Sequence, residues 1–403
     1  MNVDWIQSAA SRYDSCIRDT LHWMLGRELS GSGLLNTKVD PLTGVDYDFS
    51  TGLRGPDFTY GWIQGRGLEA LVAFAIHYRD IDQQLSARLN QIARSLYSTL
   101  AELHIRDGHA FFLYDKMMRP IRQGNDGLEQ QATPGSVFTY SDAFVAKGLF
   151  AASCHFDPDR SGEYLAYILD VVAAIEDDCF QMNETQILSA AYAKAEANDY
   201  GPKMILLGAS GLLLDNNRPI EAAFANQFID DVLERYFDQA SGLLLNVPGQ
   251  DNCNVGHAIE FCGFAFEYLQ EQPDNSRIAT LAYVLKNSLK TGLQGPGIAL
   301  SLSATSGKAV SPYYPWWPMP EAIRACALAF TLTGDKSILP LWQQADEAFF
   351  SNFWRASQRF AYQTRTEEGP IDFVPATPDL DPGYHTGLSM LSAIKSIENH
   401  FSS

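Results

Sequence analysis

The sequence lacks several patterns that mark common functional classes. Its six cysteines form no CxxC pair or zinc-type spacing, and it contains no GxxxxGK[ST] phosphate-binding loop and no GxSxG nucleophile elbow. No apolar run approaches the ~18 residues that cross a membrane, and the N-terminal residues show no leader pattern. We therefore expect a cytoplasmic protein whose site needs no metal, nucleotide or other cofactor.

Basic residues are also scarce. Lysine and arginine number 29 against 48 aspartates and glutamates, which gives a formal net charge of -19. Nucleic acids and anionic membranes bind basic surfaces, so this charge speaks against both as partners. The composition is even along the chain and shows no linker, which predicts one domain over residues 1–403 although the length alone would suggest two or three. We expect a small molecule as the partner, and a homodimer is compatible with the sequence.

Alternation typical of strands is rare, and apolar residues recur mostly with the helical period. Turn signals such as Gly-Pro, Asp-Pro and Thr-Gly-Asp divide the chain into about twelve predicted helices. Their approximate ranges are 3–28, 62–79, 82–106, 137–155, 160–182, 202–214, 218–238, 256–271, 274–292, 318–334, 337–356 and 384–399.

These predicted helices are of two alternating kinds. Segments such as 82–106 have one apolar stripe and one polar face, whereas segments such as 256–271 are apolar or small nearly all round. A helix that is apolar on every side is surrounded by protein, while a helix with one stripe faces water on its other side. Six inner helices that alternate with six outer ones predict an all-α fold, the (α/α)6 barrel. A solenoid of helix pairs is the alternative, but it would leave a more polar helix layer.

In such a barrel the inner helices run in one direction, so their N-termini meet at one rim. Polar and aromatic residues that are unexpected in apolar helices gather at these N-termini, where free N–H groups and positive helix ends also point. Aromatic faces beside hydrogen-bonding side chains in a concave pocket suit a carbohydrate ring. The candidate site residues are Tyr60, Gln64, Arg66, Tyr140, Asp142, Lys203, His257, Glu260, Trp316, Trp317, Glu321, Tyr384 and His385.

Each candidate also has a structural explanation when it is taken alone. Arg66 could serve an ion pair, His257 with Glu260 could cap a helix, and Trp316 with Trp317 could be core. The occurrence of such residues at six helix starts favours the site. The histidines form no HxxxH or HxH pair that would indicate zinc.

Four segments resemble, in order, the signature segments of the N-acylglucosamine 2-epimerase superfamily, which includes cellobiose 2-epimerase and aldose–ketose isomerases. They read FTYGWIQGRGLEALVAFAIHY, NVGHAIEFCGFAFEYL, YPWWPMPEAIRACALAFTLTGD and DPGYHTGLSMLSAI, and the resemblance spans about residues 1–400. It implies an (α/α)6 barrel and an isomerase that acts on a sugar. The WIQGR form of the first segment is closest to the N-acylglucosamine 2-epimerase branch.

The resemblance also implies roles for individual residues. His257 and His385 match the two catalytic histidines of the family, Arg66 matches its substrate-oxygen arginine, and Glu260 matches the glutamate beside the first histidine. Trp316 and Glu321 fall in the WWPxxE segment. The chain departs from the family at 202–205, where Pro-Lys-Met-Ile replaces a motif that ends in histidine, and at 319–320, where it carries Met-Pro. These departures leave the identity of the sugar open.

The chemistry that such residues can perform is proton transfer at carbon 2 of an open-chain, unphosphorylated sugar. Histidine acts as acid or base near neutral pH, and arginine stabilises an enediolate oxygen. We expect Glu260 to orient His257. Epimerisation and aldose–ketose isomerisation use the same groups, so both remain open. Alternatives are a glycoside hydrolase or lyase that uses Asp142 and Glu321, and a non-catalytic sugar- or protein-binding member.

Overall fold

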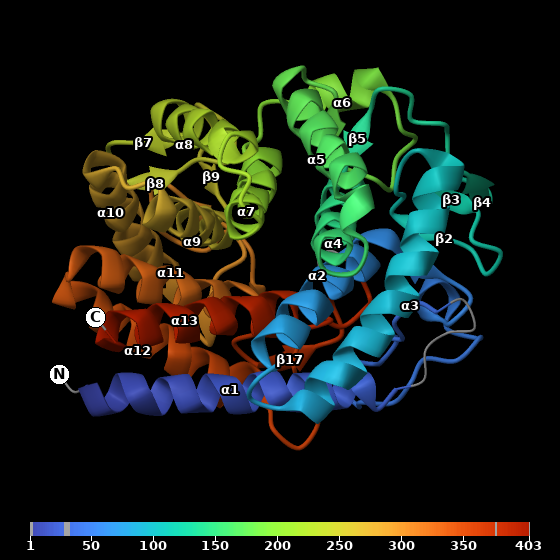
Figure 1. Ribbon diagram of the computed structural model, residues 1–403. Coiled ribbons are helices and arrows are strands. Elements are labelled where there is room, and N and C mark those ends of the chain that lie inside the picture. Colours follow the sequence, from blue (N-terminus) through green and yellow to red (C-terminus); the bar gives the residue numbers. More distant parts are fainter. Residues whose placement is uncertain (1–2, 28–32, 375–376, 403) are drawn as a thin grey trace.

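The computed structural model describes residues 3–27, 33–374 and 377–402, and most of them lie in helices (Figure 1). All twelve predicted segments overlap a helix; residue 28, the predicted end of the first, lies outside the described residues. The short α6 was not predicted. The α-helices of this part of the chain are α1 (Val3–Leu25), α2 (Gly61–His77), α3 (Gln83–Asp107), α4 (Tyr140–Phe156), α5 (Ser161–Glu176), α6 (Ala190–Glu196), α7 (Gly201–Asp215), α8 (Phe224–Arg235), α9 (Val255–Glu271), α10 (Asn275–Gly292), α11 (Pro318–Thr333), α12 (Leu339–Ala348) and α13 (Ser389–Ser402).

Helices that alternate along the chain pack side by side in a ring. The order is α2, α4, α7, α9, α11 and α13, and a π-helical turn before α13, Tyr384–Leu388, contacts α2 and closes the ring. We call these six the inner helices. The helices α1, α3, α5, α8, α10 and α12 each pack on an inner neighbour from outside. This is an α/α barrel. In a solenoid the first and last inner helices would not contact each other.

Burial separates the two kinds of helix as the sequence predicts. In α11, all twelve residues from Pro318 to Ala329 are buried. In α3, the buried residues recur every three or four positions along one stripe, from Leu85 to Leu103. An inner helix therefore has protein on all sides, whereas an outer helix presents one face to water.

Two glycines let α2 and α4 approach closely. A methyl group on Gly65 would lie 2.6 Å from the backbone of Phe144, and one on Gly148 would lie 2.5 Å from the carbonyl oxygen of Gly65. Any larger residue at either position would push the helices apart. Because α2 carries Arg66 directly after Gly65, this contact fixes the depth of Arg66 in the barrel.

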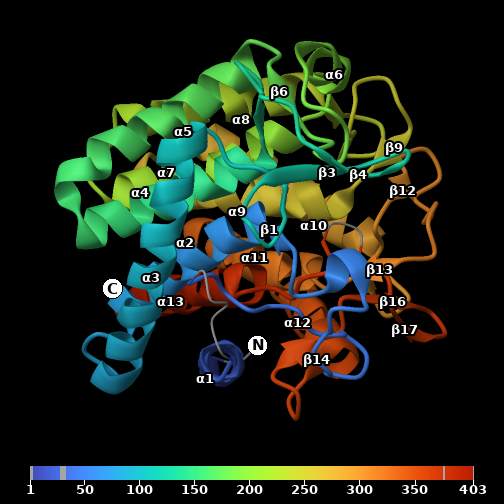
Figure 2. The same ribbon diagram turned by 90° about the vertical axis from the view of Figure 1, so that its right-hand side faces the viewer.

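The strands are short and lie at the rim of the barrel. β1, β5, β9 and β13 end immediately before or within three residues of the starts of α2, α4, α9 and α11, and β9, β12, β13, β16 and β17 gather on one side of the molecule (Figure 2). β5 and β6 pair in parallel; the other pairs are antiparallel, including the sheets β1–β2–β3–β4 and β13–β16–β17. The ranges are β1 (Thr59–Tyr60), β2 (Leu113–Tyr114), β3 (Pro120–Gly124), β4 (Gly127–Gln130), β5 (Phe138–Thr139), β6 (Phe180–Gln181), β7 (Phe237–Asp238), β8 (Leu243–Leu244), β9 (Asn252–Cys253), β10 (Leu293–Gln294), β11 (Gly297–Ile298), β12 (Leu302–Ser303), β13 (Tyr314–Pro315), β14 (Trp354–Arg355), β15 (Phe360–Ala361), β16 (Thr364–Thr366) and β17 (Gly369–Ile371).

The first and last helices of the described chain, α1 and α13, pack against each other (Figure 1). All six cysteines are free thiols, and four of them are buried, as their apolar surroundings predict. Within the described residues, no helix combines the length and the apolar character that a membrane crossing requires.

Candidate active site

A cavity of about 320 Å³ lies at the N-terminal ends of the inner helices, where the sequence predicts the site. Apolar and aromatic side chains line it together with histidines, carboxylates and an arginine. The lining residues are Trp62, Ile63, Arg66, Tyr140, Phe144, Met204, Ile205, Asn254, His257, Glu260, Leu300, Pro315, Trp316, Trp317, Gln363, Val374, Thr377, Asp379, Asp381 and His385.

His385 reaches this cavity from the π-helical turn Tyr384–Leu388. Gly383, which precedes the turn, has a φ of 89°, a left-handed conformation that favours glycine. The carboxylate of Asp381 accepts hydrogen bonds from the backbone N–H groups of Tyr384, His385 and Thr386 at 3.0, 3.2 and 3.1 Å. A π-turn is uncommon and often occurs at functional sites. Here it directs the ring of a 6 % exposed histidine into the cavity.

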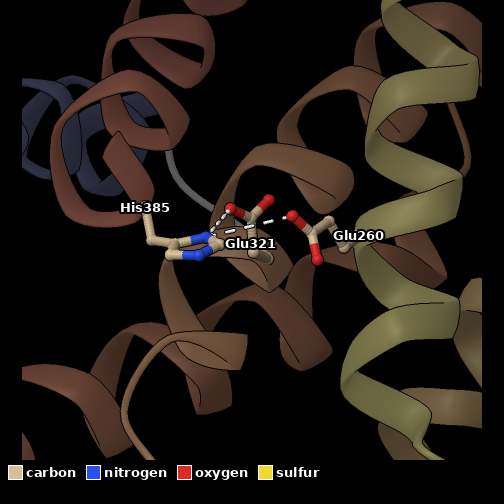
Figure 3. Close-up of side chains that lie close together, drawn as sticks. All are labelled: Glu260, Glu321 and His385. Carbon is tan, nitrogen blue, oxygen red and sulfur yellow. Dashed lines mark hydrogen bonds and ion pairs between the residues drawn. The ribbon is translucent and has the colours of Figure 1, made fainter. Parts of the chain in front are cut away.

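A carboxylate outside the cavity lining binds the Nδ1 side of His385. The Nδ1 of His385 lies 2.8 Å from Oε1 of Glu321 on α11 (Figure 3). The same oxygen accepts a hydrogen bond from Ser389 at 2.9 Å, and Oε2 is ion-paired with Arg324. Burial raises the pKa of Glu321, but Arg324 and His385 outweigh this effect and leave the pKa below its usual range. Because a carboxylate only accepts, Nδ1 carries the proton and Nε2 is the basic nitrogen of the neutral ring.

Glu260 projects from α9 toward the same histidine without bonding to it. Its Oε1 lies 3.9 Å from Nδ1 of His385 (Figure 3) and has no hydrogen-bond partner in the described part of the chain. Burial and the neighbouring charge of Glu321 raise the pKa of Glu260 to about 8. At pH 7 it is therefore mostly a neutral acid whose O–H can be donated to an oxygen in the cavity.

The expected contact between Glu260 and His257 is not found, and neither is a helix cap formed by Glu260. Asn254 caps α9 and accepts the backbone N–H of His257 at 3.2 Å. The imidazole of His257 makes no hydrogen bond with any described residue, and its ring packs 5.6 Å from that of Trp317. Burial, with a smaller contribution from His385, lowers the pKa of His257 to about 4. His257 is thus neutral at pH 7 and lacks a carboxylate to stabilise its charged form.

Arg66 lines the cavity as a cation that forms no ion pair within the described part of the chain. Its guanidinium carbon lies 4.1 Å from the ring centroid of Phe144 and 5.2 Å from that of Trp62. No carboxylate of residues 3–27, 33–374 or 377–402 lies within 4.0 Å of it, and its Nε atom is buried without a hydrogen bond. The structural explanation as an ion-pair partner therefore does not apply, and the charge is available to a ligand.

The two tryptophans at the start of α11 contact the histidines in different ways. The ring of Trp317 lies 5.6 Å from both His257 and His385 and forms the wall between them. The ring of Trp316 meets His385 edge-on at 5.8 Å and is 5 % exposed. Tyr140 stacks on Trp62 at 6.0 Å on the facing wall. Trp316, Trp317 and Tyr140 all line the cavity, as the sequence predicts, and offer flat apolar faces.

Six predicted site residues lie outside the cavity lining, and Glu321, which holds His385, is one of them. The other five have other roles. Gln64 exchanges two hydrogen bonds with the backbone of Leu35, at 2.8 and 3.1 Å. Tyr60 packs with Ile63 and Leu113. Lys203 is ion-paired with Asp231 on α8. These three fix the barrel wall.

The other two are held by buried polar partners. Asp142 closes the capping box of α4 with Thr139 and accepts the hydroxyl of Tyr167 at 2.6 Å. Tyr384 accepts a hydrogen bond from Lys147 at 2.7 Å and faces away from the cavity. Glu321 also does not line the cavity, because His385 covers it. Position at a helix start thus does not determine the direction of a side chain.

Several lining residues were missed from the sequence. Asn254 and Asp381 stand in the segments that carry the two histidines, and their places at the starts of a helix and a π-turn were the available signal. Gln363 and Asp379 come from loops, where no periodic pattern exists. Asp379 is 4 % exposed and is bound by Lys38 at 2.9 Å and by Thr37.

Nδ1 of His385 and carboxylate oxygens of Glu260 and Glu321 lie within 4.8 Å of one another, close enough to surround a cation. In the protonation state described above, these three side chains do not suit a metal cation. Nδ1 carries a proton, Glu321 is neutralised by Arg324, and Glu260 is mostly protonated at pH 7. A metal ion would have to displace both protons and compete with the arginine.

Comparison with known proteins supports the fold. No family model and no curated protein matches the sequence. A D-mannose isomerase structure superposes with a TM-score of 0.74 at 13 % identity, over 96 % of this chain and 97 % of that chain. Cellobiose 2-epimerase from Spirochaeta thermophila gives 0.73 at 13 % identity over 98 % of both chains. The enzyme of the same name from Bacillus thermoamylovorans gives 0.71 at 17 % identity over 96 % and 99 %. This chain shares its fold with sugar epimerases and isomerases of the superfamily that its sequence segments resemble.

Proposed function

We propose that this chain is a carbohydrate isomerase of the N-acylglucosamine 2-epimerase superfamily, with an (α/α)6 barrel, which transfers the proton on carbon 2 of an unphosphorylated sugar. One observation carries the proposal: His257 and His385 line a single cavity together with Arg66, a guanidinium that no described carboxylate neutralises. The names of the neighbouring structures support a sugar substrate.

The reaction begins with an open-chain aldose whose carbonyl acidifies the neighbouring C2–H. A histidine takes this proton, the C–H electron pair forms the C1=C2 double bond, and the carbonyl oxygen becomes the enediolate oxyanion. Arg66 stabilises this oxyanion, which is the type of contribution that charged donors make when charge develops. Return of a proton to C2 on the opposite face re-forms the C1 carbonyl and gives the epimer. Return to C1, together with transfer of the O2 hydroxyl proton to O1, forms the C2 carbonyl and gives the ketose.

The two histidines have unequal environments, and this favours His385 as the base. Its imidazolium form would face the Glu321 carboxylate at 2.8 Å, whereas His257, with a pKa of about 4, has no carboxylate partner in the described residues. One histidine that returns the proton from C2 to C1 is sufficient for isomerisation. Epimerisation additionally requires a proton on His257. The site therefore supports aldose–ketose isomerisation more directly than C2 epimerisation.

A glycoside hydrolase needs two carboxylates on opposite sides of the bond that breaks. Of the two candidates from the sequence, Asp142 lies outside the cavity lining and Glu321 is covered by His385 and bound by Arg324. The geometry therefore gives this alternative no support. A non-catalytic sugar-binding protein would use the same cavity, and turnover separates the two.

The test is incubation with D-mannose, cellobiose and N-acetylglucosamine in D2O, followed by proton NMR at C2. The wild-type protein should exchange C2–H and form ketose. His385→Ala should lower exchange by about 10²–10⁴-fold, and His257→Ala should lower it less. His22→Ala, at an exposed position, is the control. Retained exchange in both cavity variants would contradict the proposal, and sugar binding without any exchange would favour the non-catalytic alternative.

A further inference from the structure

Isomerisation of a sugar moves one proton between carbon atoms and a second proton between oxygen atoms. A single histidine is sufficient for the first transfer. For a ketose to form, the hydroxyl proton of O2 must also be replaced by a proton on O1, where the oxyanion develops. His385 is not free for this second step, because its Nε2 holds the proton from C2 and its Nδ1 is bonded to Glu321. The group that completes it must give one proton and take another while it contacts both oxygens.

Most polar groups of the cavity lining are unsuited to this transfer. The guanidinium of Arg66 and the indoles of the tryptophans only donate hydrogen bonds. The carboxylate of Asp381 accepts three backbone N–H groups, and that of Asp379 is bound by a lysine and a threonine. The two nitrogens of His257 point away from each other across the ring, so they cannot contact neighbouring sugar oxygens together.

Glu260 is the lining residue whose carboxyl group is buried and still available. It is 2 % exposed, and its Oε1 has no hydrogen-bond partner within the described part of the chain. It follows His257 by three residues on α9, so both side chains leave the same face of the helix toward the cavity. Its Oε1 lies 3.9 Å from Nδ1 of His385, but that nitrogen already donates to Glu321 (Figure 3).

The protonation of Glu260 suits a proton relay. Burial and the charge of Glu321 raise its pKa to about 8, so the group is mostly neutral at pH 7. A neutral carboxyl group offers an O–H donor beside a carbonyl acceptor. The O1 oxyanion and the O2 hydroxyl of a cis-enediolate offer the complementary acceptor and donor. Rotation about the terminal torsion of a glutamate is soft, so its two oxygens can align with them.

We propose that Glu260 relays a proton between O1 and O2 of the enediolate and thereby controls ketose formation, an inference that rests on the proposed function. The O–H proton of Glu260 passes to a lone pair of O1, while its other oxygen takes the proton of O2. The electron pair of the broken O2–H bond forms the C2 carbonyl, and the C1=C2 pair takes the proton from Nε2 of His385 onto C1. Glu260 ends with one proton, His385 is neutral again, and no further reactant is consumed.

The ratio of ketose formed to deuterium found at C2 of the aldose, measured by NMR in D2O, tests this inference. Glu260→Gln keeps the size of the side chain, but an amide does not readily exchange protons between its nitrogen and oxygen. His385 should still remove and return the C2 proton in this variant, while the ratio should fall at least about tenfold below that of the wild-type protein. Glu234→Gln, which removes an exposed carboxylate of α8 outside the cavity, is the matched control and should leave the ratio unchanged.

Glu260→Met covers the case in which Glu260→Gln fails to fold. Because Oε1 of Glu260 is buried without a partner, an apolar side chain of similar length removes an unsatisfied polar atom and should be tolerated. The ratio should fall in this variant as well. A role in positioning alone would lower exchange and ketose formation together and leave the ratio unchanged.

The outcomes separate this inference from the proposed function. An unchanged ratio in the folded variants would overturn the inference and assign the transfer to another group, such as a water molecule. C2–H exchange without ketose in the wild-type protein would also overturn it, while the proton transfer at C2 would stand. No exchange in the wild-type protein would refute the proposed function itself, and the inference with it.

Discussion

The Nδ1 of His385 lies 2.8 Å from Oε1 of Glu321, and this contact distinguishes His385 from the other cavity histidine. A carboxylate at this position fixes the tautomer and stabilises the imidazolium that forms when the ring takes a proton. Burial lowers the pKa of His385, and the bond to Glu321 offsets part of that effect. The pair is therefore suited to accept a proton reversibly near neutral pH.

Replacement of the Glu321 carboxylate should make His385 a poorer base without changing the shape of the cavity. Glu321→Gln keeps the shape but removes the charge, and its amide can donate to Nδ1 and leave the proton on Nε2. We expect C2–H exchange to fall by about 10²–10⁴-fold with a smaller change in KM. Ser389→Ala removes only the neutral hydrogen bond to the same oxygen and is the matched control. An exchange rate near that of the control would show that the contact has no part in proton transfer.

The pH dependence of exchange should have two limbs. On the acid side the rate rises as His385 loses its proton, below the ordinary histidine value because its pKa is lowered. On the basic side it should fall near pH 8, where Glu260 ionises and places a negative charge beside the enediolate. Glu260→Gln stays neutral, so its profile should lose the basic limb and keep the acid one. A basic limb that persists in this variant would assign it to another group.

Glu260 should also make stability depend on pH. Its folded pKa of about 8 lies above the ordinary value of 4.5, so the folded state keeps a proton that the unfolded state has lost between these values. Stability is then greatest at low pH and falls as pH rises, by at most about 1.4 kcal/mol per pH unit.

The slope from Glu260 is clearest between pH 6.5 and 8, because His257 opposes it at lower pH. His257, with a folded pKa of about 4 against 6.5, makes stability rise with pH between those two values. Thermal melts should show Glu260→Gln gaining stability over the wild-type protein as pH rises from 6.5 to 8, and little difference at pH 5. Parallel curves for the two proteins would refute the raised pKa.

Arg66 should contribute mainly to the transition state. Arg66→Met removes the charge that faces the enediolate oxygen, and we expect kcat to fall by about 10²–10³-fold. Arg66→Lys keeps a charge without the planar fork that stacks on Phe144, so it should recover only part of the rate. Steady-state kinetics on the sugar identified by exchange measures both effects. A rise in KM alone would assign Arg66 to ground-state binding.

The barrel was predictable because its physical cause is visible in single helices. Apolar residues on every side of α9 and α11 require protein all round, and the amphipathic α3 requires water on one face. The short strands were not predicted, because pairs such as Tyr314–Pro315 are too short to show alternation. The π-turn that carries His385 also depends on hydrogen bonds to the Asp381 carboxylate, and no periodicity in the sequence predicts them.

The gathering of the candidate residues at one rim was predictable from the sequence, but the pairings among them were not. Helix starts indicated which residues gather at the rim, and Arg66, His257, Glu260 and His385 line the cavity. The sequence neighbours His257 and Glu260 suggested a pair, yet both partners of the observed contact come from other helices. Three-dimensional proximity of Glu321 and His385 depends on the packing of α11 beside α13 and the π-helical turn that precedes it, which local sequence does not encode.

Arg324 is buried with Glu321 on α11 and is ion-paired with it. Removal of one member of a buried ion pair leaves the other charged and unpaired, so Arg324→Met should lower the free energy of unfolding by about 3–5 kcal/mol. The double variant Glu321→Gln/Arg324→Met removes both charges of the pair and should lose less than the sum of the single variants. Arg277→Met, which breaks the more exposed pair with Asp230, is the control and should cost about 1 kcal/mol or less. Denaturant melts of the four proteins measure the coupling, and additive losses would mean that the pair contributes no interaction energy.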